Sequence, residues 1–412
     1  MGLLPGLLAL RPPRIRGCAR LLVFLLLCLA VAIGLSMARS VFVGVPFAYA
    51  NLWEFVKIGK IVLIVLFVSS MKNSIVARLP KLASVYHVAS FIVIAVTVSQ
   101  YLTWPNGIGA RLAEAYAVPE QFNISYLGSR RAPATAVAPN VGAEVALLVL
   151  SLTAALAVNG VRRSLSAAVA TGLLAVVALT GTRAGIAMVG VLGLMAALES
   201  LRMRDRRILV RPAYLVFAVL VVAAGAAAAL SGSHPYFAGL VKLVQTADLA
   251  SDISTASRVT RFWPAVIEAW SHSPILGWGP AKATEWRLIT DSEYLYNLLH
   301  YGVIGSGIIM LFYLVVFHAA HRVAKVAADP LPRSFAQAVK WAVPAILMGN
   351  LTHTLFWDIQ SIQAFSLGFS IVLALEADLC YPLTRERCLP RADDTRRTTG
   401  HGALPALGGP AP

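Results

Sequence analysis

The stretch LLVFLLLCLAVAIGLSM at residues 21–37 decides the fold class, because it carries no charged residue. Its length approaches the roughly 20 apolar residues that a helix needs to cross a bilayer. Similar runs bounded by charged residues recur along the chain. They predict membrane spans near residues 21–37, 54–71, 82–101, 140–159, 164–180, 184–199, 209–230, 298–318, 337–353 and 359–376. The sequence therefore predicts an all-α, polytopic membrane protein with about ten transmembrane helices.

The overall composition agrees with this prediction. Of the 412 residues 58% are hydrophobic and only 13% are charged, which excludes a soluble globular enzyme. The net charge of +16 would suggest nucleic acid as a partner of a soluble protein, but in a membrane protein basic residues set the topology. Most of the 35 Lys and Arg residues fall in segments that are cytoplasmic if the N-terminus is. We therefore expect both termini in the cytoplasm and no nucleic-acid partner.

The domain organisation follows from the positions of the spans. Residues 1–380 are expected to form a single transmembrane domain, and the tail 381–412, rich in Pro, Gly, Arg and Ala, has little to bury and is expected to be disordered. The topology leaves two long exterior segments, 102–139 and 231–297. Loops longer than about fifteen residues are uncommon unless they are functional, so the site is expected there.

Arg183 is the first candidate for chemistry, within Thr-Gly-Thr-Arg-Ala-Gly at residues 180–185. An arginine between two apolar spans is costly unless an anion meets it. The alternative is an arginine that extends to the membrane surface, as is common at helix ends.

The second exterior segment contains an amphipathic stretch at residues 257–272. Its apolar stripe has helical spacing and predicts a helix in the membrane surface: Trp263, Val266, Ile267 and Trp270. Pro264 can begin this helix, which would leave Arg258 and Arg261 on the chain that enters it. Two guanidinium groups would bind a lipid diphosphate bidentately. Attraction to anionic lipid headgroups is the alternative.

Asp291 and Glu293 stand where the eighth predicted span opens, and such carboxylates are candidates for a general base. The alternative is a plain helix start, because Thr290 and Glu293 have capping-box spacing. The segment Pro-Ile-Leu-Gly-Trp-Gly at 274–279 allows close approach of the backbone. Gly302, Gly305 and Gly307 indicate close helix packing.

Other polar residues are weaker candidates. Asn140 and Glu144 lie one helical turn apart, and Glu144 in an apolar run needs a partner. His353 can pair with Asp358. Two further histidines are interpreted as structural, His87 and His300. The sequence shows no cluster typical of a metal site and no Walker loop, so we expect no metal, no other cofactor and no ATP-driven pump.

The order of these motifs resembles one superfamily. Thr-Gly-Thr-Arg-Ala-Gly is followed by Ser257-Arg258, the aromatic helix, Pro-Ile-Leu-Gly-Trp-Gly, then Asp-Ser-Glu-Tyr-Leu at 291–295 and Gly-Val-Ile-Gly at 302–305. Together with Pro139-Asn140 this resembles the O-antigen ligase and O-antigen polymerase superfamily of bacterial membrane proteins, over residues 138–310.

The resemblance implies a GT-C-type glycosyltransferase of the bacterial inner membrane, with an undecaprenyl-diphosphate-linked glycan as donor. The acceptor is another lipid-linked repeat unit in polymerases and lipid A core in ligases. Further implied partners are membrane lipids and a chain-length regulator. Arg183 and Arg258 are expected to bind the donor diphosphate, with Arg261 as the neighbouring alternative. Three residues are expected to support the site: Asn140, Glu293 and Tyr294.

Ligases of the superfamily usually have His-Asn or His-Ser where this sequence has Asp291-Ser292. The departure favours a polymerase in O-antigen or exopolysaccharide biosynthesis, in which Asp291 takes the proton of the acceptor hydroxyl in a metal-independent, inverting transfer. The alternatives are an O-antigen ligase, a flippase for lipid-linked oligosaccharide and, third, a cell-wall glycan polymerase. A flippase should line its centre with charges from several spans, which this sequence does not predict.

Overall fold

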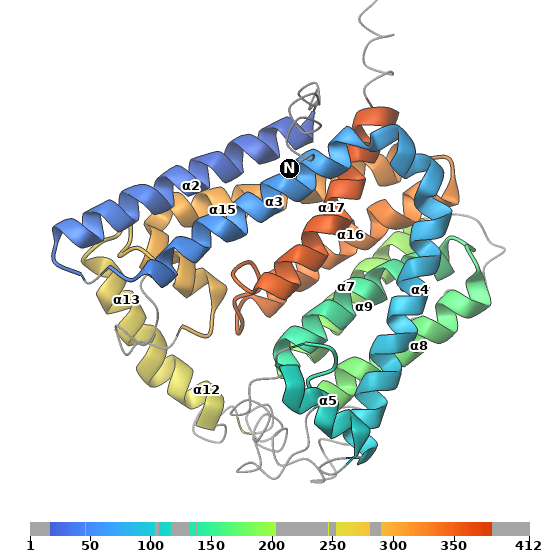
Figure 1. The fold of residues 1–412 in the computed structure, drawn as a ribbon, viewed down its shortest axis with the longest axis horizontal. Helices are drawn as coiled ribbons and strands as arrows, with labels where there is room; N and C mark the ends of the chain where they lie inside the picture. The colour runs from blue at the N-terminus through green and yellow to red at the C-terminus, as the bar shows by residue number, and fades with distance from the viewer. Residues whose placement is uncertain are drawn as a thin grey trace, which may run out of the picture.

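The computed structural model describes residues 17–45, 47–103, 107–116, 132–136, 138–202, 246, 253–280 and 290–380. Within these ranges every regular element is a helix (Figure 1). The long ones are α2 (Cys18–Phe42), α3 (Trp53–Ser70), α4 (Lys72–Thr103), α7 (Pro139–Val158), α8 (Arg163–Thr180), α9 (Arg183–Arg202), α15 (Glu293–Val326), α16 (Pro330–Gly349) and α17 (Ile359–Leu379). The short ones are a 3₁₀ turn (Tyr49–Leu52), α5 (Ile108–Tyr116), α12 (Ile253–Ser257), a π-helical turn (Arg258–Phe262) and α13 (Trp263–Ser271).

The predicted all-α, polytopic class is confirmed. Six helices in the described part of the chain are long and apolar enough to cross a membrane, namely α2, α4 from Ile75, α7, α8, α15 and α17. The remaining long helices, α3, α9 and α16, also coincide with predicted spans. The predicted span 209–230 and the tail 381–412 lie outside the described residues. The total of about ten spans therefore stays a prediction.

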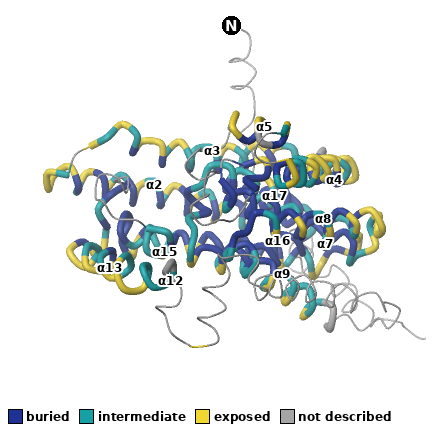
Figure 2. The backbone as a smooth tube through the Cα atoms, turned by 90° about the horizontal axis from the view of Figure 1, so that it is seen from below, coloured by how far each residue is buried: buried dark blue, intermediate teal, exposed yellow. Residues whose placement is uncertain are grey.

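The centre of the molecule is formed by α7, α15, α16 and α17. Helix α7 packs against α8 and α16, and α16 packs in turn against α15 and α9. Trp341 of α16 is fully buried in this core, and Figure 2 shows the buried backbone concentrated around α16 and α17. The outer helices α2, α3 and α4 expose many large apolar side chains, as helices that face lipid do.

Successive helices run in opposite directions, so one end of the bundle gathers the starts of α7, α9, α15 and α17 and the ends of α8 and α16. We call this the site end. Helix α13 packs against α15 at the same end, and α12 lies beyond α13 (Figure 1). The predicted exterior segments thus contribute their described residues to one end of the molecule.

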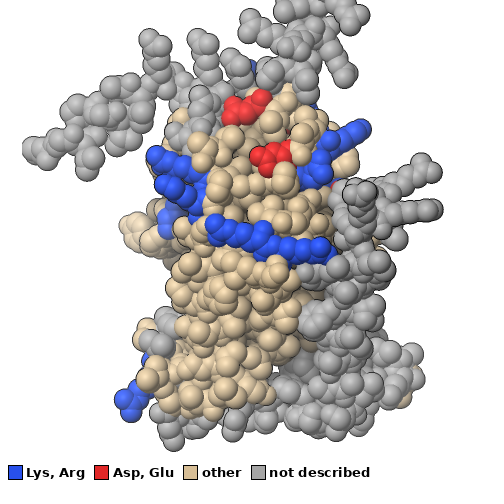
Figure 3. All heavy atoms as spheres, turned by 90° about the vertical axis from the view of Figure 1, so that its right-hand side faces the viewer, with Lys and Arg blue, Asp and Glu red and all other residues tan. Residues whose placement is uncertain are grey.

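The opposite end carries exposed basic residues at the helix turns, including Arg78, Lys81, Arg162 and Arg163. Figure 3 shows Lys and Arg side chains in a band toward one end of the face that includes α4 and α8, above a broad surface with few charges. This distribution is the one that the positive-inside rule requires. Which end faces the cytoplasm stays a prediction.

Arg322 and Glu376 join α15 to α17 at the opposite end, with Nη1 of Arg322 2.7 Å from Oε1 of Glu376. Glu376 is fully buried. We expect Arg322→Ala to destabilise the protein by about 2 kcal/mol, because it leaves a buried carboxylate unpaired, while partial exposure of Arg322 moderates the loss. Thermal unfolding in detergent measures this effect. The control is Arg162→Ala, an exposed residue whose change should cost less than about 0.5 kcal/mol. Equal losses in both variants would contradict the interpretation.

Candidate functional site

The turn between α8 and α9 fixes Arg183 at the site end. Helix α8 ends at Thr180, and Gly181 takes the left-handed conformation (φ 61°) that glycine adopts readily. The hydroxyl of Thr182 accepts a hydrogen bond from the backbone N–H of Gly185 at 3.2 Å, which caps the new helix. A Cβ at Gly185 would lie 3.0 Å from the Cβ of Ala143, so the start of α9 packs closely against α7. Arg183, half-buried, is the first residue of α9.

The arginines of the second exterior segment lie on a helical turn. Helix α13 begins at Trp263 with Pro264 in its first turn, as predicted. The expectation that Arg258 and Arg261 lie on an entering strand of chain is wrong, since they belong to a π-helical turn that continues α12 into α13. Proline has no N–H and clashes with the carbonyl four residues earlier, and a wider turn before it relieves that clash.

Arg258 and Asp291 form an ion pair that joins two predicted site residues across 33 positions of sequence. Nε of Arg258 lies 3.0 Å from Oδ2 of Asp291. The side chains are 20% and 35% exposed, so both are accessible from the surface. Arg261, from the same π-helical turn, has its guanidinium carbon 5.8 Å from the ring centre of Phe262. The pair brings the predicted donor-binding and proton-accepting groups into one place.

A break in α15 joins the two segments of chain that carry this pair. Gly302 has φ 61° and ψ −164°, which divides α15 into two helical pieces. The backbone groups around the break bond to the turn after α13: Trp278 N–H donates to the carbonyl of Leu299 at 2.8 Å, and Val303 N–H to that of Pro274 at 2.9 Å. The close approach predicted for 274–279 is confirmed. Gly302 serves this backbone contact rather than ordinary helix packing, and for Gly307 the packing prediction is wrong, because no heavy atom lies within 4 Å of a Cβ built there.

The capping box predicted at Thr290 and Glu293 is also wrong. Helix α15 begins at Glu293, and its cap residue Ser292 makes no side-chain capping bond. The carboxylate of Glu293 is buried and accepts hydrogen bonds from the N–H of Phe356 at 2.7 Å and the hydroxyl of Tyr313 at 3.2 Å. The Glu293 side chain forms these buried hydrogen bonds instead of the capping bond that its spacing predicted. Glu293 thus ties the opening of α15 to the loop between α16 and α17.

Tyr294 makes a second tie. Its hydroxyl donates to the carbonyl of Leu347 in α16 at 2.6 Å. Asn140 lies in the first turn of α7 and is half-buried. Both residues therefore stand at the site end. Their expected supporting role stays a prediction, as do the roles of Arg183, Arg258, Arg261 and Asp291.

Glu144 has the partner that its sequence environment required. Its carboxylate is 1% exposed, with Oε1 2.7 Å from Nδ1 of His353 and Oε2 accepting a hydrogen bond from the hydroxyl of Ser361 at 2.7 Å. The predicted pair of His353 with Asp358 is not observed, because Asp358 caps α17 through the N–H groups of Gln360 and Ser361. Although burial lowers it, the carboxylate of Glu144 raises the pKa of His353 above its ordinary value.

The two histidines interpreted as structural fit that interpretation. His87 is buried, with Nδ1 2.7 Å from the carbonyl of Ala83 and Nε2 3.0 Å from the hydroxyl of Ser166. His300 is buried with Nδ1 2.6 Å from the carbonyl of Gly279. The contact between His300 and Gly279 belongs to the turn at 274–279, which forms backbone hydrogen bonds to the break in α15.

A known family matches the middle part of the chain, where most of the predicted site residues lie. Residues 166–310 match the family model described as O-antigen ligase. This part of the chain is therefore similar to the O-antigen ligase family. The match confirms the resemblance drawn from the motifs. No curated protein matches the chain.

The O-antigen ligase match begins in α8 and extends into α15, so it contains Arg183, Arg258, Arg261 and Asp291. Glu144 and His353 lie outside it and reach the site through α7 and the loop before α17. Segments outside the match thus contribute further polar side chains to the site end.

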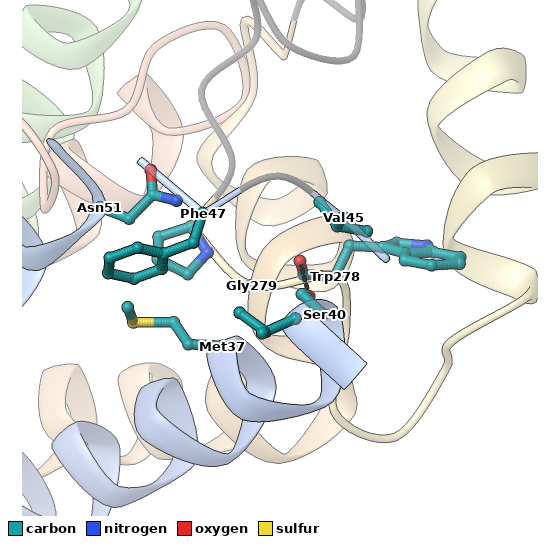
Figure 4. Close-up of a pocket in the computed structure, with 9 residues that line it drawn as sticks. Met37, Ser40, Val45, Phe47, Asn51, Trp278 and Gly279 are labelled. Carbon is teal, nitrogen blue, oxygen red and sulfur yellow. Dashed lines mark hydrogen bonds between the residues drawn. The ribbon is translucent and has the colours of Figure 1, made fainter. Parts of the chain in front are cut away.

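A small pocket near the O-antigen ligase residues is a separate feature (Figure 4). It lies between the end of α2 and the turn after α13, where the Ser40 hydroxyl donates to the carbonyl of Trp278. Its lining is mostly apolar: Met37, Ser40, Val41, Val45, Phe47, Asn51, Trp278, Gly279 and Pro280. The predicted site residues do not line it, so we do not assign the transfer reaction to this pocket.

Proposed function

We propose that this protein transfers glycan from undecaprenyl diphosphate to a lipid-linked acceptor at the periplasmic face of the bacterial inner membrane, as a polymerase in O-antigen or exopolysaccharide biosynthesis. The family match supports a ligase-type or polymerase-type role in O-antigen biosynthesis. The observation that supports the finer proposal is the Arg258–Asp291 ion pair, in which a guanidinium lies 3.0 Å from a carboxylate at the site end.

The donor diphosphate would be held by arginines from two elements. Arg183 begins α9, and the N-terminus of a helix favours an anion through its dipole and N–H groups. Arg258 enters its ion pair through Nε, and a guanidinium presents further N–H groups in a planar fork suited to phosphate. Arg261 lies on the same turn as Arg258 and is the alternative ligand.

The transfer step follows from this binding. An acceptor hydroxyl oxygen forms a bond to the anomeric carbon as the bond from that carbon to the diphosphate oxygen breaks, and the electron pair leaves with the diphosphate. Fixed arginines stabilise the charge that develops there, so a metal ion is not required. Attack from the face opposite the leaving group inverts the anomeric carbon. The acceptor proton passes to a base, and Asp291 is the residue predicted from the sequence for this role.

A ligase is the second candidate, because the matched family is described as O-antigen ligase. Asp291-Ser292 in place of the histidine usual in ligases favours the polymerase. The family match favours either transferase over the flippase.

Deletion of the gene followed by gel analysis of surface polysaccharide tests the proposal. We expect core capped with a single repeat unit, because units would still be made and exported but not joined. Bare core with accumulated lipid-linked polymer would indicate the ligase instead. Repeat units retained on the inner face would indicate the flippase and contradict both transferase assignments.

A further inference from the structure

The loop between α16 and α17 contributes a further titratable residue, His353, to the site end. The N–H of Glu293, the first residue of α15, lies 2.8 Å from the carbonyl oxygen of Asn350 and 3.2 Å from that of His353. Glu293 follows Asp291 by two residues. The backbone of His353 is therefore fixed next to the chain that carries the Arg258–Asp291 pair.

The side chain of His353 is oriented by a buried carboxylate. Glu144 places Oε1 2.7 Å from Nδ1 of the imidazole, and Ser361 holds the other carboxylate oxygen. A carboxylate 2.7 Å from Nδ1 stabilises the protonated imidazole, and Nε2 is the ring nitrogen that does not face this carboxylate. The side chain of His353 is 19% exposed, so its ring is partly accessible. The carboxylate of Glu144, in contrast, is buried.

Asp291 differs from His353 in its partner. Its carboxylate faces the guanidinium of Arg258, whereas the imidazole of His353 faces the carboxylate of Glu144, which favours the protonated ring. The arrangement therefore separates two tasks. The carboxylate of Asp291 is paired with Arg258 and orients that arginine, while the imidazole of His353, whose protonated form Glu144 stabilises, can accept the proton.

We propose that His353, oriented by Glu144, is the general base of the transfer and that Asp291 is a positioning residue for Arg258. This inference rests on the proposed function. In the step, the proton of the acceptor hydroxyl moves to Nε2 of His353 as the oxygen bonds to the anomeric carbon, and the imidazolium that forms is stabilised by Glu144. The proton is then released to water, and the diphosphate departs with the electron pair of the broken bond.

The charged groups around His353 set the expected pH dependence. They are Glu144 from α7, Glu293 from α15 and Asp358 at the start of α17. Burial lowers the pKa of His353, but the nearby carboxylates, Glu144 first, raise it above its ordinary value. A base must be unprotonated to act. The transfer rate should therefore rise with pH through this raised pKa and level off above it.

The decisive variant is His353→Asn in the purified full-length protein, assayed with lipid-linked repeat units across pH. The asparagine amide can still donate to Glu144 but has no ring nitrogen to accept the proton. We expect the rate to fall about a hundredfold or more and the rise with pH to disappear. Unchanged affinity for a short-chain polyprenyl diphosphate would show that the variant is folded. Asp291→Asn should lower the rate yet keep the rise with pH.

A second measurement, the pH profile of Asp291→Asn, tests the inference even if His353→Asn does not fold. The profile of Asp291→Asn leaves His353 untouched, and loss of its pH-dependent rise would assign the base to Asp291 and overturn the inference. A wild-type rate and profile in His353→Asn would do the same. If the wild-type protein transfers no glycan between lipid-linked units, the proposed polymerase function itself fails, which is a separate result.

Discussion

Replacing Arg258 by alanine is expected to lower the rate of glycan transfer at least a hundredfold. The variant removes a guanidinium that would meet the charge developing on the leaving diphosphate, and loss of one such preorganised donor costs about two to three orders of magnitude in other enzymes. It also leaves Asp291 without its partner at 3.0 Å. The measurement is turnover of lipid-linked repeat units by purified protein.

Arg261→Ala is the matched control, because it removes the same charge from the same π-helical turn. Arg261 lies against Phe262 rather than Asp291, so we expect a loss of less than about tenfold. Equal rates for wild type and Arg258→Ala would exclude a role for Arg258 in the reaction. A larger loss in Arg261→Ala would transfer the assignment to Arg261.

The second large effect is expected at the break in α15. Gly302→Ala should destabilise the protein by about 3 kcal/mol, because it combines an unfavourable backbone conformation with overpacking. A Cβ there would lie 2.2 Å from the carbonyl oxygen of Ile275, which is backbone and cannot turn aside. The measurement is the midpoint of thermal unfolding in detergent.

Gly307→Ala is the control for this prediction. Gly307 lies in the regular part of the same helix with open space around its Cβ position. Alanine favours a helix over glycine by about 1 kcal/mol, so this variant should be as stable as the wild type or more so. Equal stability of the two variants would show that the contact between 275 and 302 contributes little.

Local patterns predicted much of this fold. Apolar runs located each long helix in the described part of the chain, because a helix that faces lipid must be largely apolar. Boundaries were less accurate. Helix α15 begins at Glu293 rather than near 298, because its first polar turn is buried against the loop before α17 instead of ending at water.

The site was predicted only in part, since its pairs are formed between distant segments. The motifs located Arg258 and Asp291 separately, but their contact joins residues 33 positions apart in segments that the turn at 274–279 and the broken helix also link. Glu144 indicated that a partner existed, and only the packing of α7 against α17 shows that it is His353 with Ser361. The capping-box prediction was wrong because the spacing of Thr290 and Glu293 does not show that the side chain of Glu293 is buried.

The π-helical turn at Arg258–Phe262 also sets the angular phase of the surface helix. A π-helical turn contains about one residue more than an α-helical turn. Because each residue of an α-helix turns the chain by about 100°, the helix after the turn is rotated by about this angle relative to an uninterrupted α-helix. The arginines of the turn and the tryptophans after it therefore face directions that an uninterrupted helix would not combine. Removing a single residue from the turn would rotate the aromatic stripe relative to the arginines, so the length of this short segment, and not only its side chains, sets their relative orientation.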